Sequence, residues 1–274
     1  MLLTQNDAYH YHLFVPDADT SPAVLVEPRG DALWIRLNRP RRRNAYDAEM
    51  AGLIAEALQG ANTFRSVVIT GVERSFCAGG SLSTLGAPTP GALRGLYASS
   101  LRLFDAIRTC PRPVIAAVNG AAAGGGNELV VACDLAVAAR SATFGQTGPR
   151  VGSAPVTGAT NVMSVQIGEK RAKELSFLCR RYTAEQALEM GLVNKVVDDD
   201  QLEEQVRSWC AEITALSPRY LEITKVSSNI WWNAARDSFS SGLGMLIQAI
   251  GSEDMVEGAN AFLEKRPPKF ELHE

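Results

Sequence analysis

Short apolar runs alternate with amphipathic stretches over the first two thirds of the chain. AVLVEPRGDALWIRLNRP, residues 23–40, predicts two strands joined by a turn at Arg29-Gly30-Asp31. Compact apolar runs bounded by glycine or polar residues predict further buried strands at 66–71, 113–120 and 134–139. Apolar residues at every third or fourth position predict helices at 47–61, 93–108, 170–177 and 184–191, with another after the glycines of 124–126.

Only helical periodicity is found after residue 198. It predicts helices at 202–216, 219–232 and 236–262. Strands that alternate with helices, followed by helices alone, indicate an α/β fold with a helical C-terminal extension. We therefore divide the chain into an N-terminal arm (1–22), an α/β core (23–198) and a C-terminal helical region (199–274).

Composition narrows the class of function. The net charge of −3 and pI near 5.8 give no reason to expect a nucleic-acid or anionic-membrane partner. Five widely spaced cysteines without a CxxC motif predict reduced thiols and a cytoplasmic location. We expect no signal peptide, and no apolar run reaches the ~18 residues of a membrane helix.

The three histidines, His10, His12 and His273, all lie near the chain ends. This position argues against a Ser-His-Asp triad or a His-ligated metal in the core. We expect no metal and no separate cofactor, so that any chemistry uses carboxylates, hydroxyls or backbone groups.

A triple glycine, 124–126, stands where a strand passes into a helix, in AAAGGGNELVVACD (121–134). Unpaired N–H groups at such a helix start favour an anion or a developing oxyanion. Close packing of helix against sheet is an equally open interpretation. The pattern matches neither a GxGxxG nor a P-loop motif, because Leu129 occupies the last glycine position and no GK[ST] follows.

A second glycine turn, SFCAGGSL (75–82), also follows a predicted strand. Two such turns directed at one carbonyl oxygen would form an oxyanion hole. Glu128 lies one helical turn after Gly125 and would share a face with that amide. The alternative is that Glu128 only stabilises the first turn of the helix through the helix dipole.

Six ordered motifs give the chain a family resemblance. They are LNRPRRRNA (37–45), SFCAGGSL, PVIAAVNGAAAGGGNELVVACDLAVA (113–138), ATFGQTGPRVG (142–152), A-x-E-x-G-L-V-N-x-V-V (187–197) and SEDMVEGANAFLEKRPP (252–268). Over about residues 25–270 the chain resembles the crotonase (enoyl-CoA hydratase/isomerase) superfamily. The resemblance implies an α/β, ClpP-like crotonase fold of repeated ββα units, C-terminal helices that support a homotrimer or a hexamer, and an acyl-CoA thioester substrate.

The same resemblance implies roles for individual residues. Gly80 and Gly125 match the two amide donors, and Glu128 matches a glutamate that activates or positions water. The Ala78 carbonyl matches the position that reads the adenine amino group. The positions beside the CoA nucleotide and its ribose phosphate are Arg39, Arg43 and Asn44, then Lys265 and Arg266 near the C-terminus; an ordinary solvated turn would also explain the arginines.

Further polar or lining positions of the acyl pocket are expected from their motifs. They are Leu82 and the polar residues Ser81, Ser153, Thr157, Thr160 and Asn127, and each polar one would also suit an ordinary cap or satisfied hydroxyl. The adjacent Trp231 and Trp232 must face different ways on a helix, so we expect one in the core and the other at an interface or in the acyl pocket.

The sequence departs from the hydratase pattern at the second glutamate, where Gly148 stands, and at an aspartate replaced by Ser81. FGQTGPRVGS resembles the branch that holds naphthoyl-CoA synthase, whose aspartate is replaced here by Pro155. GSAPVTGAT (152–160) resembles 6-oxocyclohex-1-ene-1-carbonyl-CoA hydrolase. Hydration or hydrolytic ring opening of an alicyclic (oxo)acyl-CoA is therefore our first expectation. The alternatives are hydration or isomerisation of another enoyl-CoA, carbon–carbon bond formation, and a non-catalytic acyl-CoA scaffold.

Overall fold

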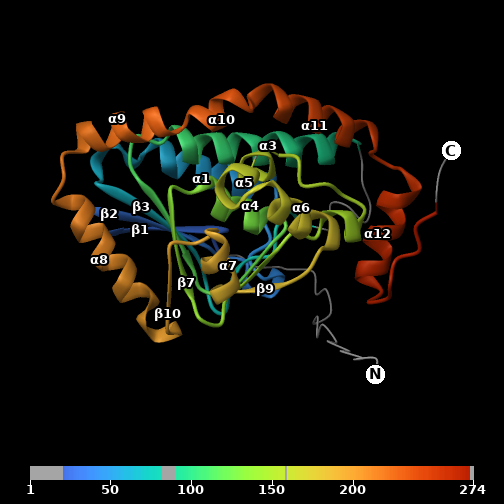
Figure 1. Cartoon of the computed structure of the whole chain (residues 1–274), viewed down its shortest axis with the longest axis horizontal. Coiled ribbons are helices and arrows are strands. Elements are labelled where there is room, and N and C mark those ends of the chain that lie inside the picture. The colour runs from blue at the N-terminus through green and yellow to red at the C-terminus, as the bar shows by residue number, and fades with distance from the viewer. Residues whose placement is uncertain (1–20, 82–89, 158, 272–274) are drawn as a thin grey trace.

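The computed structural model describes residues 21–81, 90–157 and 159–271 and contains a six-stranded sheet with helices around it (Figure 1). The strand order is β1-β2-β3-β5-β7-β10, and every neighbouring pair except the β1–β2 hairpin is parallel. The strands are β1 (Val24–Arg29), β2 (Ala32–Leu37), β3 (Ser66–Gly71), β5 (Val114–Val118), β7 (Leu135–Ala139) and β10 (Lys195–Val197). The predicted hairpin and the three predicted strands are confirmed.

Alternate residues of these strands face two separate cores. Leu33, Ile35 and Ile69 belong to the larger core, which α1 (Ala48–Gln59) and α3 (Pro90–Thr109) also line. Trp34 and Val68, on the other face, pack against α8 (Leu202–Thr214). Both faces of the sheet are thus buried, which explains why its parallel strands read as continuous apolar runs.

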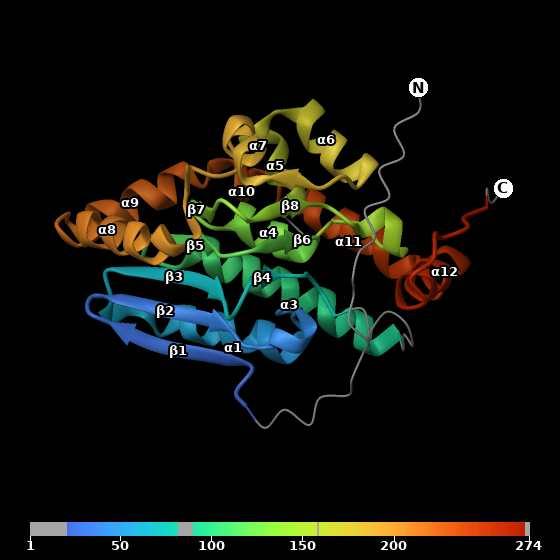
Figure 2. The ribbon, with the colours of Figure 1, turned by 90° about the horizontal axis from the view of Figure 1, so that it is seen from below.

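A smaller sheet, with the order β4-β6-β8-β9, lies beside the first one (Figure 2). Its strands are β4 (Ser75–Cys77), β6 (Ala121–Ala123), β8 (Thr143–Gly145) and β9 (Tyr182–Thr183). β4, β6 and β8 run parallel, so their carboxyl ends meet at one edge. None of these strands of two or three residues is predicted by the sequence pattern.

Short helices surround this second sheet. They are α4 (Gly125–Ala132), α5 (Ala159–Ile167), α6 (Glu169–Leu178) and α7 (Ala184–Met190). The described chain also has the 3₁₀ turns η1 (Pro40–Arg42), η2 (Ala61–Thr63), η3 (Gly148–Val151) and η4 (Asp199–Gln201). The predicted helices at 170–177 and 184–191 are confirmed, whereas α5 is not predicted.

The C-terminal helices follow α8; the first three run above α3, and the last lies at the right of the view (Figure 1). They are α9 (Pro218–Ser228), α10 (Ile230–Ala234), α11 (Arg236–Gln248) and α12 (Glu253–Leu263). Two predicted helices are therefore each split in two. Asn229 interrupts the first and donates a 2.8 Å hydrogen bond to the Arg108 carbonyl. Gly251, with φ of 83°, ends the second before Ser252 caps α12.

Trp232 and Trp231 have the expected opposite environments. Trp232 is 2% exposed and packs edge-on against Phe239 at 5.1 Å, whereas Trp231 is 59% exposed. None of the helices that the structure describes is both long and apolar enough to cross a bilayer. The expected arm, residues 1–22, lies almost wholly outside the described residues.

Candidate functional site

Three parallel strands end on one cavity of about 90 Å³. Ala78–Gly80 follow β4, Gly124 and α4 follow β6, and Gln146–Gly148 follow β8. All three segments line the cavity, together with residues of η3 and α3. The carboxyl ends of parallel strands are the usual place for a ligand site in α/β folds, and both predicted glycine turns meet there.

The three consecutive glycines each have a separate structural reason. Gly124 has φ of 53°, which L side chains rarely adopt. A Cβ atom on Gly125 would lie 2.5 Å from the Tyr46 hydroxyl oxygen. A Cβ atom on Gly126 would collide with the Cys77 carbonyl oxygen. Close packing therefore explains Gly126, whereas Gly124 and Gly125 leave bare backbone on the cavity wall.

The two glycine turns touch each other. A Cβ atom on Gly79 would lie 2.9 Å from the Gly125 nitrogen. Tyr46 holds the first turn by donating its N–H to the Gly79 carbonyl at 2.9 Å and accepting from the Ser81 N–H at 2.8 Å. Within the described chain, neither the Gly80 nor the Gly125 N–H donates a hydrogen bond to the protein. Two uncommitted amides thus border one cavity, as an oxyanion hole requires.

Glu128 is buried in the cavity wall at 4% exposure. Its two carboxylate oxygens accept hydrogen bonds from the Thr157 hydroxyl at 3.1 Å and the Thr160 hydroxyl at 3.0 Å. Burial raises the pKa of Glu128 to about 7, against the smaller lowering effect of the two threonine hydroxyls. The two threonines expected near the pocket therefore act on its one carboxyl group, which titrates near neutral pH.

The position of the second hydratase glutamate is closely bordered by backbone. A Cβ atom on Gly148 would lie 3.0 Å from the Ser153 carbonyl oxygen and 3.1 Å from Cδ of Pro155. A side chain at position 148 would therefore press on the segment 153–155, which would have to shift by a few tenths of an ångström. Glu128 is the only carboxylate among the described residues that line the cavity.

Sequence reasoning missed five polar residues of the cavity: Tyr46, Tyr97, Ser100, Gln146 and Thr147. The Gln146 side chain is fully buried, and neither its amide nitrogen nor its oxygen has a hydrogen-bond partner. The Tyr97 hydroxyl is also buried without a partner in hydrogen-bond geometry. Gln146 stands inside the quoted FGQTGP motif, so its position beside Gly148 was the available signal. Nothing in the local pattern distinguishes Tyr46 or Tyr97 from core tyrosines.

The residues expected beside the CoA nucleotide divide into two groups. Ala78 lines the cavity, and its N–H donates to the Arg43 carbonyl at 3.0 Å. The Arg43 side chain is exposed, and Arg39, four residues earlier, is half-buried. Asn44 is fully buried, donates to the Val72 and Ser75 carbonyls and accepts from the Arg39 N–H. The Asn44 amide is thus used by the fold to hold residues 39, 72 and 75 together.

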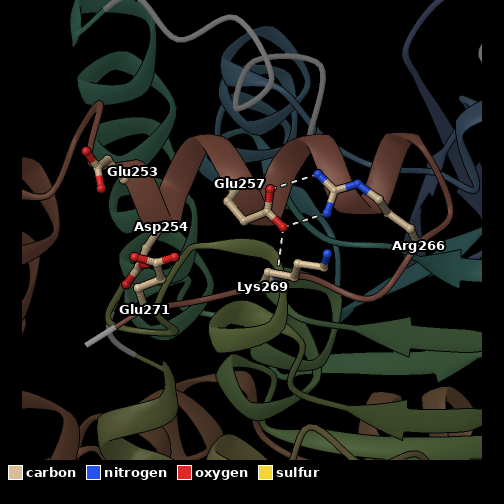
Figure 3. A pocket seen from close by; sticks show the side chains of 6 residues that line it. All are labelled: Glu253, Asp254, Glu257, Arg266, Lys269 and Glu271. Carbon is tan, nitrogen blue, oxygen red and sulfur yellow. Dashed lines mark hydrogen bonds and ion pairs between the residues drawn. The ribbon is translucent and has the colours of Figure 1, made fainter. Parts of the chain in front are cut away.

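The expected basic pair near the C-terminus lies away from the cavity. Arg266 makes a two-pronged ion pair with Glu257 at 2.5 and 2.7 Å (Figure 3). Its Nε also donates a hydrogen bond to Glu264. The hydrogen bonds from Arg266 to Glu257, with the Lys269 N–H, lower the pKa of Glu257 to about 2. Arg266 is therefore held by carboxylates within its own chain, while Lys265 is exposed beside it.

The other expected pocket residues differ in position. Ser153 lines the cavity, whereas Ser81 is buried next to it without lining it. Asn127 is turned into the core, with its amide nitrogen 3.8 Å from the Met163 sulfur, so the expectation that it lines the pocket is wrong. Leu82 lies outside the described residues. Over the described ranges, no three His, Cys, Asp or Glu side chains are grouped so as to hold a metal ion.

Comparison with known proteins identifies the family. Residues 29–273 match the model of the enoyl-CoA hydratase/isomerase family. An enoyl-CoA hydratase from Mycobacterium avium subsp. paratuberculosis is 28% identical, with a TM-score of 0.81 over 91% of this chain and 99% of that one. An enoyl-CoA hydratase from Bacillus anthracis is 32% identical, with a TM-score of 0.74 over the same shares. An enoyl-CoA hydratase/isomerase from Pseudoalteromonas atlantica is 26% identical, with a TM-score of 0.82 over 91% and 100%. The chain belongs to the enoyl-CoA hydratase/isomerase family of the crotonase superfamily and has its α/β fold.

Proposed function

We propose that this protein adds water to an acyl-CoA thioester, with the thioester oxygen held between the N–H groups of Gly80 and Gly125. The observation that carries the proposal is the meeting of two uncommitted glycine amides and one buried carboxyl group in a single cavity. Negative charge collects on the thioester oxygen when the substrate becomes an enolate. Two amides fixed in advance stabilise that charge, and loss of one such donor costs about 3–4 kcal/mol.

Glu128 moves the proton. As a carboxylate it takes a proton from water while the hydroxide oxygen bonds to the β-carbon of the enoyl group. The π electrons shift toward the thioester and form the enolate. The protonated Glu128 then returns its proton to the α-carbon, so the carboxylate is regenerated and one water has been added. A pKa of about 7 suits both steps at neutral pH.

The more specific form of the proposal is hydrolytic opening of an alicyclic oxoacyl-CoA. Hydroxide adds to a ring ketone at the β position, and the bond between that carbon and the α-carbon breaks. The products are a carboxylate and the same thioester enolate, which takes up a proton. The motif GSAPVTGAT supports this form, because it supplies both Thr157, which binds Glu128, and the segment that lies against Gly148.

A second candidate is a double-bond isomerase. The missing second carboxylate favours it, because a single carboxyl group suffices to move a proton between two carbons. Incubation with linear enoyl-, cyclic enoyl- and cyclic oxoacyl-CoA thioesters in H₂¹⁸O, read by mass, separates the candidates. Only hydration or hydrolysis incorporates the label, whereas isomerisation leaves the mass unchanged. Tight CoA binding without turnover of any thioester would instead support a non-catalytic scaffold.

We also propose a trimer, or a hexamer of two trimers, in the cytoplasm. An apolar stripe on the outer side of α9 and α10 supports association; it consists of Tyr220, Ile223, Val226, Ile230 and Trp231, each more than half exposed. The five buried, unpaired cysteines fit a reducing compartment. Ile223→Asp should yield a smaller species than the wild type by light scattering after size exclusion, and an unchanged mass would remove the stripe from the interface.

The CoA assignments remain part of this proposal. Ala78 would read the adenine through its carbonyl, while Arg39, Arg43 and Lys265 would approach the phosphates. Arg266 would have to leave Glu257 to do so. Arg43→Ala should raise KM for acyl-CoA without changing kcat, because a phosphate contact distant from the reacting atoms is equal in the ground and transition states.

A further inference from the structure

Tyr46 is the residue that contacts both glycine turns. Its backbone holds the first turn through hydrogen bonds on either side of Gly80. Its side chain faces the second turn, where the hydroxyl oxygen lies 2.5 Å from the position that a Cβ atom of Gly125 would take. Gly125 can have no side chain while the phenol is there. The hydroxyl group therefore lies beside the backbone that we propose to hold the thioester oxygen.

The surroundings of this hydroxyl keep it neutral. Tyr46 is 2% exposed, and burial together with the negative charge of Glu128 raises its pKa well above the usual value, against a lowering effect of the Ser100 hydroxyl. The Ser100 hydroxyl itself donates to the Leu96 carbonyl at 2.9 Å. A phenol that does not ionise can donate a hydrogen bond but cannot act as a general base at neutral pH.

The phenol is not hydrogen-bonded to the carboxyl group of the cavity. Both oxygens of Glu128 are taken by the threonine hydroxyls, and Tyr46 is not among the groups that lower the pKa of Glu128. Within the described chain, the side-chain hydrogen-bond neighbour of the Tyr46 hydroxyl is Ser100. Tyr46 lines the cavity together with Gly125 and Glu128, where the acyl group would be held.

We propose that the Tyr46 hydroxyl is a third hydrogen-bond donor to the reacting acyl group, beside the two amides. This inference rests on the proposed function. The donor strengthens its hydrogen bond as negative charge builds on the substrate and needs no proton transfer of its own. This hydrogen bond replaces part of the stabilisation of the transition state that a second acidic side chain at position 148 would have supplied.

Tyr46→Phe isolates the hydroxyl, because the backbone ladder to Gly79 and Ser81 and the aromatic ring beside Gly125 are both kept. We expect kcat to fall by about 10- to 100-fold, the range for a hydrogen bond to a charged group, with KM changed less than threefold. The matched control is Tyr182→Phe, which removes a hydroxyl that donates to Glu174 outside the cavity. It should keep wild-type kcat.

A binding measurement separates this inference from the proposed function. Acetoacetyl-CoA can ionise to an enolate with its own ultraviolet absorption, so the bound enolate fraction reports stabilisation of charge without turnover. Wild-type protein should raise that fraction above its value in solution, and Tyr46→Phe should lower the bound enolate-to-keto ratio by about tenfold or more.

Each result decides one of the two ideas. If wild-type protein turns over no thioester and does not favour the bound enolate, the proposed function is wrong. If wild-type protein does both and Tyr46→Phe matches it in kcat and in enolate ratio, the inference about Tyr46 is overturned. If Tyr46→Phe alters the circular dichroism spectrum or the oligomeric mass, the same measurements are made on Ser100→Ala instead. This change leaves the phenol without its neighbouring hydroxyl and should alter the enolate ratio by at least twofold; no change would likewise overturn the inference.

Discussion

Replacing Glu128 by glutamine should stabilise the protein at high pH. The pKa of this carboxyl group is about 7 in the folded chain, against 4.5 for an ordinary glutamate. Between pH 4.5 and pH 7 the Glu128 carboxyl group therefore keeps its proton in the folded state and loses it in the unfolded state. Raising the pH through this window therefore ionises a buried group and lowers the free energy of unfolding. At about 1.4 kcal/mol per pH unit, the gap between the two values corresponds to about 3 kcal/mol.

Glu128→Gln keeps the shape of the side chain and cannot ionise. The free energy of unfolding of this variant, relative to wild type, should thus rise by about 3 kcal/mol between pH 4.5 and pH 8. Urea unfolding at several pH values and fixed protein concentration measures the difference. Glu56→Gln, at an exposed position of α1, controls for the loss of one negative charge. A difference that stays constant with pH, or that falls, would refute the burial argument for Glu128.

The same carboxyl group links stability to activity. If Glu128 accepts the proton of water, kcat/KM of the wild type should rise with pH and level off above an apparent pKa near 7. Glu128→Gln should lose about 100-fold or more in kcat while it gains stability. If kcat of Glu128→Gln stays within a few-fold of the wild-type value, Glu128 only stabilises the first turn of its helix through the helix dipole.

Three further substitutions test the cavity walls. Gly125→Ala puts a methyl group against the Tyr46 hydroxyl and should cost about 1–3 kcal/mol in urea unfolding, whereas Gly95→Ala, on α3 with open space around it, should not destabilise. Gly148→Glu should lower the melting temperature without raising the hydration rate, because its side chain would press on residues 153–155; a faster rate would contradict this. Gln146→Leu removes two buried, unpartnered amide atoms and should stabilise the ligand-free protein by about 1–3 kcal/mol, so a lower melting temperature would count against it.

The sequence predicts the larger sheet better than the smaller one. Residues 66–71 form a strand with the predicted bounds, and all six are buried. A short apolar run that ends in glycine is typical of such a buried strand, so the sequence alone indicates it. β6 is only Ala121–Ala123 and is held by strands at 75–77 and 143–145. Three alanines have no periodicity, so this strand exists because of its neighbours. The split of α11 from α12 depends on a single glycine conformation at Gly251.

The sequence predicts the backbone turns of the site, but it predicts the contacts of the side chains less well. The glycine turns are visible because glycine is rarely placed without a reason, and three in succession follow a strand. The burial of Glu128 is not visible, because its partners Thr157 and Thr160 lie 29 and 32 residues away in the sequence. Tyr46 is missed for the same reason: its hydroxyl meets Gly125 only after two sheets have formed.

A single carboxyl group can serve this cavity because its pKa is set by two opposed effects. Burial alone would keep Glu128 protonated and unable to accept a proton from water. The Thr157 and Thr160 hydroxyls stabilise the charged form and bring the pKa back to about 7. A second carboxylate at position 148, facing the same 90 Å³ cavity, would raise the pKa of Glu128 again through like-charge repulsion. The backbone beside Gly148 and the pair of threonines are thus two parts of one arrangement, in which the same group both accepts and returns the proton.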